Sequence, residues 1–263
     1  MNGIALRPSY WASVSGGKDS LYMLNYILHN RDIYPLDGVV HYELEIDFPF
    51  IHDVIDYMES ECNRFGIRFM RIKPRKTWEE LYYQTFKSTG KIRGFPTRRA
   101  RWCNSVYKLD ASKQLDEWLK TVGYYSVHYI GFCADEIKRF KQQRIEKGTE
   151  RYPLAEAGIT EDTIWDWAKT QPIFNHYYKT NKRCGCMYCP LSAKINYAYL
   201  YKYYPDNFAY MIEKMRETEK IREAELGRPF SVTSSNPKYN ADYLENIIKT
   251  KWIKKLNEME EQK

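Results

Sequence analysis

Short apolar runs alternate with amphipathic stretches over the first 130 residues, and this alternation constrains the fold more than any other feature. Runs typical of buried strands occupy residues 10–15, 36–44, 67–73 and 125–132. Stretches of helical period lie between them, at residues 20–30, 50–66 and 110–123. Since neighbouring parallel strands need crossover connections, the pattern predicts an α/β fold. We expect a parallel twisted sheet with helices on both faces, Rossmann-like in its winding.

The character of the sequence changes near residue 151. The remaining stretch reads as mainly helical and tyrosine-rich, and it contains the group RCGCMYCPLS at residues 183–192. We therefore expect two domains: an α/β domain over residues 1–150, and a mainly helical region over residues 151–263 that carries the cysteine cluster.

The stretch SVSGGKDS, residues 13–20, lies at the joint between the first predicted strand and the first predicted helix. Its glycines allow positive φ or close approach of a ligand to the backbone. The helix that follows points free N–H groups and the positive end of its dipole at the same place. The stretch therefore predicts a phosphate-binding loop. It is not a Walker-type loop, because Asp19 follows the lysine and the required earlier glycine is absent.

Residues Ser15 to Ser20 resemble the S-G-G-x-D-S signature of the PP-loop ATP pyrophosphatases. The resemblance implies an adenine nucleotide, ATP or a relative of it, bound with Mg²⁺ and attacked at its α-phosphorus. It implies catalytic roles for Lys18, Asp19 and Arg101. The nucleotide-binding residues that we predict are Ser15, Gly16, Gly17, Lys18, Asp19, Ser20, Glu43, Gly131, Glu136 and Arg139. Gly131, like Ser15, lies at the carboxyl end of a predicted strand, where such sheets bind ligands.

Further segments resemble the phosphoadenosine-phosphosulfate reductase family, and together they cover most of residues 10–195. They are the F-P of residues 48–49, RRARWCNSVYK, GFCADEIKRF, RYPLAEAGITEDTIWDW and CGCMYCPLS. The departures from that family are informative. Glu43-Leu44-Glu45 occupies the position of the family's D-T-G, and Cys133 and Ala157 replace an arginine and a tryptophan of the family pattern. No cysteine follows Cys189. Since the reductases use a nucleophilic cysteine in their tail, we expect adenylylation of a substrate with release of pyrophosphate. A sulfonucleotide reductase with an unusual cysteine is the alternative.

Four of the six cysteines form a candidate metal site. Cys186 and Cys189 make a C-x-x-C followed by proline, and Cys103 lies 83 residues upstream, a separation similar to that in iron–sulfur adenylylsulfate reductases and DNA-phosphorothioation enzymes. This pattern predicts a [4Fe–4S] cluster, or alternatively Zn²⁺, on Cys103, Cys186 and Cys189 with Cys184 or Cys133 as the fourth ligand. Such a cluster would support sulfur transfer. Reduced thiols packed against the sheet are the simpler interpretation, and for Cys62 we expect a buried core residue.

The segment from Lys87 to Lys108 carries seven basic residues and no acidic one, within a chain of net charge +7. Such a run is either a solvated loop or a phosphate contact for a nucleotide or nucleic acid, DNA or tRNA. Candidates for phosphate contacts are Arg99, Arg101, Lys108 and Arg139, and candidates for Mg²⁺ or hydroxyl contacts are Asp135 and Glu136. A non-catalytic nucleic-acid-binding component of a modification complex is therefore a further hypothesis.

The expected setting is the cytoplasm. The N-terminal stretch has no apolar core or cleavage pattern of a secretory signal, and no segment has the apolar length of a membrane span. A sulfur-donor protein and a second copy of this chain are the protein partners that we consider.

Overall fold

The computed structural model describes residues 6–173 and 176–262, which form two compact units. Unit 1 comprises Met1–Leu44, Pro49–Arg75 and Leu109–Phe174. Unit 2 comprises Glu45–Phe48, Lys76–Lys108 and Asn175–Lys263. The two units are interleaved in sequence, so they do not coincide with the expected division into residues 1–150 and 151–263. The reason is that two connections between elements of unit 1, Glu45–Phe48 and Lys76–Lys108, belong to unit 2.

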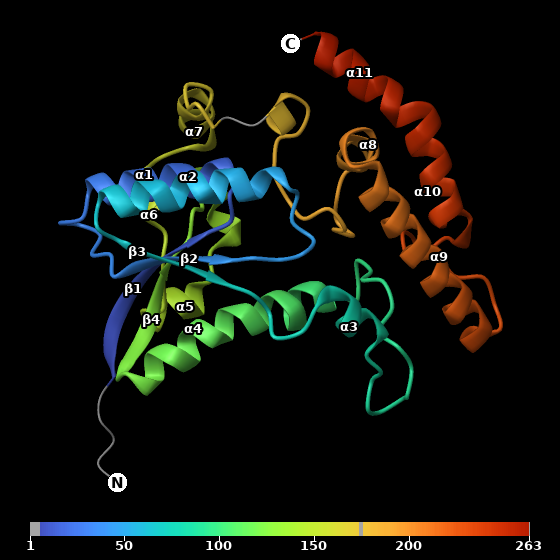
Figure 1. Cartoon of the computed structure of the whole chain (residues 1–263), viewed down its shortest axis with the longest axis horizontal. Coiled ribbons are helices and arrows are strands. Elements are labelled where there is room, and N and C mark those ends of the chain that lie inside the picture. Colours follow the sequence, from blue (N-terminus) through green and yellow to red (C-terminus); the bar gives the residue numbers. More distant parts are fainter. Residues whose placement is uncertain (1–5, 174–175, 263) are drawn as a thin grey trace. The chain divides into compact units, whose positions relative to one another are not determined.

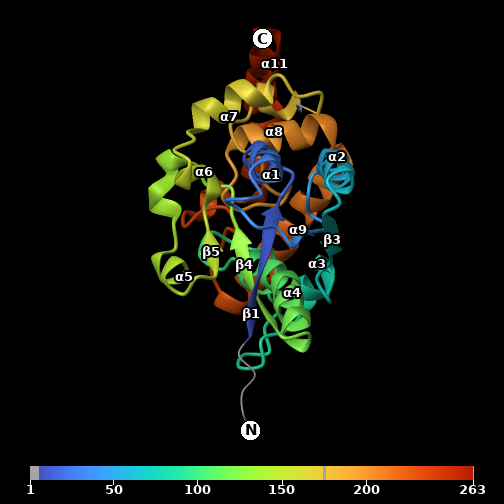
Figure 2. The ribbon, with the colours of Figure 1, turned by 90° about the vertical axis from the view of Figure 1, so that its left-hand side faces the viewer.

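Unit 1 is built on one five-stranded parallel sheet with the order β3-β2-β1-β4-β5. The strands are β1 (Arg7–Val14), β2 (Gly38–Tyr42), β3 (Arg68–Ile72), β4 (Tyr124–Tyr129) and β5 (Glu150–Arg151). In register, Trp11 pairs with Gly38 on one side and with His128 on the other. Figure 2 shows β5, β4 and β1 side by side. The α/β class and the four apolar strands that the sequence predicts are thereby confirmed.

Helices cover both faces of this sheet (Figure 1). α1 (Lys18–His29) and α2 (Phe50–Arg64) lie on one face, where α6 (Pro153–Glu156) and α7 (Glu161–Ala168) pack against α1. α4 (Leu109–Thr121) lies on the other face and buries Leu115 and Leu119 against Trp11 and Val40. The short α5 (Gln142–Glu146) leads into β5. The crossover helices bury their apolar stripes on the sheet, as the helical period predicts.

Unit 2 is mainly helical around an aromatic core. Its helices are α3 (Trp78–Tyr83), α8 (Lys194–Tyr203), α9 (Pro205–Leu226), α10 (Ala241–Ile247) and α11 (Ile253–Glu261). The Trp78 ring packs against Tyr82, Phe95 and Trp102 with centroids 5.4 to 5.8 Å apart. A turn of π-helix, Cys103–Lys108, runs on into α4. No helix in the described residues is both long and apolar enough to cross a membrane.

Candidate functional site

The SGGKDS loop connects the carboxyl end of β1 to the start of α1, where the sequence places it. Gly16 has a left-handed backbone, with φ +72°, and a Cβ there would lie 2.9 Å from the Ile51 side chain. Only glycine fits both conditions. Gly17 is the N-cap of α1, and no side-chain hydrogen bond caps this end within the described residues. The N-terminus of α1 therefore directs its N–H groups and the positive end of its dipole to the loop, where an anion is favoured.

Ser20 fixes the shape of this loop from inside α1. Its hydroxyl donates to the Gly17 carbonyl at 2.9 Å and accepts the Ser15 N–H at 3.2 Å. Leu21 N–H donates to the same Gly17 carbonyl at 3.0 Å. The loop is therefore closed by its own polar groups before any ligand binds, which lowers the entropy cost of binding.

Gly131 follows β4 and supports the loop from the neighbouring strand. A Cβ on Gly131 would lie 3.0 Å from the Asp19 carbonyl oxygen and 3.3 Å from the Ser20 nitrogen. Because both are backbone atoms, a side chain here would displace the first turn of α1. The structure thus gives Gly131 a packing reason for being glycine, beside its predicted place in the nucleotide site.

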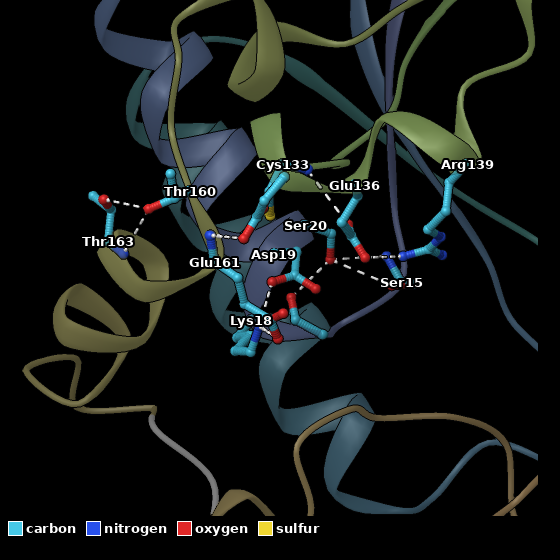
Figure 3. A network of polar contacts seen from close by, with 12 residues as sticks. Ser15, Lys18, Asp19, Ser20, Cys133, Glu136, Arg139, Thr160, Glu161 and Thr163 are labelled. Atoms are coloured by element: carbon cyan, nitrogen blue, oxygen red, sulfur yellow. Dashed lines mark hydrogen bonds and ion pairs between the residues drawn. The ribbon is translucent and has the colours of Figure 1, made fainter.

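The Lys18 ammonium is buried and lies between two carboxylates. Its Nζ is 2.5 Å from Asp19 Oδ1 and 3.2 Å from Glu161 Oε1, and the lysine side chain is 2% exposed. Figure 3 shows these three side chains pointing toward one another, with Glu161 coming from the start of α7. The Trp165 ring lies under the ammonium, 5.0 Å from it. Two carboxylates and one aromatic ring therefore hold the Lys18 ammonium in place.

Asp19 lies in a partly desolvated, acidic surrounding. Burial raises the pKa of its carboxyl, the neighbouring carboxylates of Glu136 and Glu161 raise it further, and Lys18 opposes the rise. The carboxylate of Glu136 also accepts from Arg139, at 2.7 Å, and Arg139 lies 4.0 Å above the Phe132 ring. A bound cation would relieve the repulsion among these carboxylates.

The other predicted nucleotide and cation residues occupy the carboxyl edge of the sheet. Glu43 directly follows β2, and its carboxylate lies 3.1 Å from Lys73 Nζ. Asp135 lies in the 3₁₀ turn Ala134–Arg139 after β4 and accepts the Glu161 N–H at 3.4 Å. Glu161 and Trp165 are residues that the sequence analysis missed for this site. Two signals for them exist: Thr160, an N-cap residue that marks the start of a helix, and the stretch RYPLAEAGITEDTIWDW, which contains both residues and resembles the reductase family.

The six cysteines divide between the two units. Cys62 and Cys133 are in unit 1 and fully buried, and burial raises the pKa of each thiol to about 12. The prediction of a core role for Cys62 is confirmed. Cys133 begins the 3₁₀ turn beside the loop, whereas Cys103, Cys184, Cys186 and Cys189 all belong to unit 2.

Cys186 and Cys189 form a hydrogen-bonded thiol pair. The hydrogen bond from Cys186, together with Leu191, Ser192 and Arg101, lowers the pKa of Cys189 to about 6 against the effect of burial. The same hydrogen bond, and then burial, raises the pKa of Cys186. Cys103 is close enough to both thiols for electrostatic interaction. Within the described residues, however, no group of three or more His, Cys, Asp or Glu is placed to hold a metal ion. The four candidate cysteine ligands thus belong to the same unit, but their thiols do not have the arrangement of a metal site in the described residues.

The basic segment contributes a set of unpaired cations beside these cysteines. Arg98, Arg99 and Arg101 are exposed and form no ion pair with described residues, whereas Lys91 pairs with Glu225 at 3.4 Å. Arg101 lies in unit 2, two residues before Cys103, and the phosphate loop lies in unit 1.

Fold and loop together define the class: a parallel α/β protein with a phosphate-binding type of loop after its first strand, as the PP-loop resemblance implies.

No protein-family model matches the chain. It is 26% identical over 211 residues to the uncharacterized protein MJ0973 of Methanocaldococcus jannaschii. That match covers 78% of this chain and 47% of the relative, so the chain spans about half the relative's length. Among solved structures, it resembles the U34-tRNA thiolase NcsA from Methanococcus maripaludis with its [4Fe-4S] cluster, at 15% identity and a TM-score of 0.40. The match covers 84% of this chain and 74% of the thiolase, and at this level it carries no argument about function.

Proposed function

We propose that the chain is a PP-loop enzyme that binds ATP, or a related adenine nucleotide, with Mg²⁺ and adenylylates an acceptor. The observation that carries the proposal is the preformed SGGKDS loop at the N-terminus of α1, with Gly16 in a conformation that only glycine takes easily. Backbone N–H groups and Lys18 would receive the β- and γ-phosphates.

In the proposed reaction, a nucleophilic oxygen of the acceptor attacks the α-phosphorus. A new oxygen–phosphorus bond forms, and the bond between the α-phosphorus and the oxygen bridging to the β-phosphorus breaks. The electron pair leaves with pyrophosphate, whose charge the α1 terminus, Lys18 and Mg²⁺ would stabilise. Asp19, Glu136 and Asp135 supply carboxylates for the cation.

Sulfur transfer to the adenylylated acceptor is the second part of the proposal. Cys103, Cys186 and Cys189, with Cys184 as the fourth residue, would hold a [4Fe–4S] cluster or, alternatively, Zn²⁺. A cluster held by Cys103, Cys186 and Cys189 alone would leave one iron without a cysteine ligand, and that iron could carry sulfide. The thiol pair of Cys186 and Cys189 supports this proposal, although the third and fourth donors must move to complete the site. Iron, zinc and sulfide analysis after anaerobic purification, with C186S as the comparison, tests it. Zinc or no metal would overturn the iron–sulfur assignment.

The adenylylation step can be tested by the exchange of labelled pyrophosphate into ATP in the presence of tRNA or single-stranded DNA. We expect Mg²⁺-dependent exchange, and we expect K18A to weaken ATP binding at least tenfold because the phosphates lose their cation. K113A, an exposed lysine on α4, is the matched control and should bind ATP like the unchanged protein. Equal ATP affinity of K18A and K113A, or no nucleotide binding at all, would contradict the proposal.

A further inference from the structure

Unit 2 contains a cavity of about 460 Å³ that the proposed reaction has not used so far. Its inner wall is apolar and includes Phe95, Met215 and Leu244. The hydroxyl-bearing residues Ser192, Thr233 and Ser234 also line it. Its volume lies in the usual range of small-molecule sites.

The walls of this cavity are fixed by buried hydrogen bonds. Phe95 N–H donates to Thr218 Oγ1 of α9 at 2.7 Å, and Gly94, with φ +67°, packs against the same threonine. Next to the lining residue Val232, the buried Glu219 carboxylate accepts the N–H groups of Val232 and Ala241, each at 3.0 Å. The cavity therefore exists before a ligand binds, and little ordering is needed to fill it.

The cavity's remaining lining residues combine cations with aromatic rings. Arg98 and Lys194 line it, are exposed and form no ion pair with the described residues. Tyr239 and Tyr243 are 45% and 40% exposed, with ring centroids 4.9 Å apart. Rings offer stacking surfaces, and unpaired cations offer contacts to phosphate. A ligand that matches all of these features has a flat ring, hydroxyl partners and an anionic phosphate.

This cavity also shares a wall with the cysteine turn. Two lining residues belong to this turn: Pro190 directly follows Cys189, and Ser192, three residues after Cys189, donates its N–H to the Cys189 carbonyl at 3.0 Å. Tyr197, another lining residue, donates its hydroxyl to the same carbonyl at 2.6 Å. A ligand in the cavity is therefore held next to the turn that carries the thiol pair.

We infer that this cavity receives one unstacked nucleotide of a single-stranded nucleic acid, with the base among the tyrosines and its phosphate on Arg98 and Lys194. This inference rests on the proposed function, because it takes this nucleotide as the acceptor that the enzyme adenylylates. It adds that the acceptor is a single-stranded nucleic acid. Duplexes bind poorly in this arrangement, because a base enters only after it leaves its stack. Free ATP is assigned to the loop of unit 1.

The test is fluorescence anisotropy of labelled 12-nucleotide RNA and DNA single strands and of the matching duplexes, without ATP. We expect single strands to bind at least tenfold more tightly than duplexes. The double variant R98Q/K194Q should bind at least tenfold more weakly and lower the slope of log K against log salt by about 0.7, because the one phosphate in the cavity no longer meets a cation. The matched control is K220Q/R228Q, which removes two exposed cations of unit 2 that do not line the cavity.

A second pair of variants tests the stacking surface alone. Y243L should weaken single-strand binding at least about fivefold, the low end for loss of one base–aromatic stack. Y243F should bind normally, because it keeps the ring. A preference for RNA or for DNA identifies the polymer and supports the inference in either case. Equal binding of duplex and single strand, equal affinity of R98Q/K194Q and its control, or binding of free mononucleotide in place of oligonucleotide would overturn it.

The two proposals can fail separately. If single strands bind through Arg98, Lys194 and Tyr243 but no pyrophosphate exchange occurs with any acceptor, the nucleotide cavity stands and the adenylylation proposal fails. If exchange occurs with tRNA or DNA and the cavity variants leave both exchange and affinity unchanged, adenylylation stands and the cavity inference fails.

Discussion

At the scale of single residues, the most informative feature is the pairing of the Lys18 ammonium with two carboxylates. The lysine that we propose for phosphate binding is buried between Asp19 and Glu161, over the Trp165 ring. A phosphate at Nζ would compete with these two carboxylates for the ammonium. Glu161 is the one that can leave, since it comes from α7, whereas Asp19 is the adjacent residue in α1.

This reasoning gives a prediction for E161Q. Removing the carboxylate charge frees Lys18 and lessens repulsion of the phosphates, so ATP should bind more tightly, by about fivefold if the pair is worth roughly 1 kcal/mol. Isothermal titration of ATP with Mg²⁺ measures the change. D162N, the next acidic residue in the same first turn of α7, should leave the affinity unchanged. Weaker binding by E161Q would show that Glu161 orients Lys18 toward the ligand, the opposite role.

The limits of sequence reasoning are clear at this residue. The loop could be predicted because a local pattern of glycine, serine and lysine carries it, and the glycine at position 16 has a local backbone reason. The Lys18–Glu161 pair joins residues 143 positions apart, so no periodicity or spacing indicates it. Cys103 is different, because its separation from Cys186 in the sequence does predict a common site by resemblance to iron–sulfur enzymes, and only the arrangement of the thiols depends on the folding of unit 2.

At the scale of elements, the apolar strands and their crossover helices were predicted to within a few residues, because burial on both sides of a parallel sheet leaves a continuous apolar run. The π-helical turn at Cys103 and the loop between α9 and α10 were not predicted. Both depend on contacts between elements. In the second case the contact is Glu219 of α9, whose buried carboxylate binds the backbone of Val232 and Ala241.

Glu219 gives a prediction about pH. Burial raises the pKa of its carboxyl, and the N–H groups of Ala241 and Val232 oppose the rise. The folded state therefore binds this proton more tightly than the unfolded state, and its contribution to stability is complete below the unfolded pKa of about 4.3. It is lost as pH rises through the folded pKa, by roughly 1.4 kcal/mol for each unit between the two values. Urea unfolding between pH 4 and 8 should show this loss in the unchanged protein and not in E219Q. Parallel curves for the two proteins would contradict the prediction.

At the scale of the whole molecule, the interleaving of the two units matters most. The aromatic core of unit 2 joins residues of its middle segment to α9: the Tyr82 hydroxyl donates to the Lys214 carbonyl at 3.0 Å, and Phe95 N–H donates to Thr218. In unit 1, β5 and α7 come from beyond residue 149 yet contact β4 and α1. A domain boundary requires few contacts between the residues before it and those after it. The change near residue 151 to a helical, tyrosine-rich sequence therefore does not mark such a boundary.

The last prediction concerns a fragment of residues 1–150. It retains β1 to β4 but loses the rest of β5 and all of α7, which packs on α1. It also leaves Trp78, Tyr82 and Phe95 without α9, so large apolar rings that are at most 3% exposed in the full chain become accessible to water. We expect the fragment to bind a hydrophobic dye and to unfold in urea without a cooperative transition, whereas the full chain gives a sigmoidal one. A sigmoidal transition of the fragment with an ordered near-ultraviolet circular dichroism spectrum would show that the first 150 residues fold by themselves, and that the contacts to α7 and α9 are dispensable.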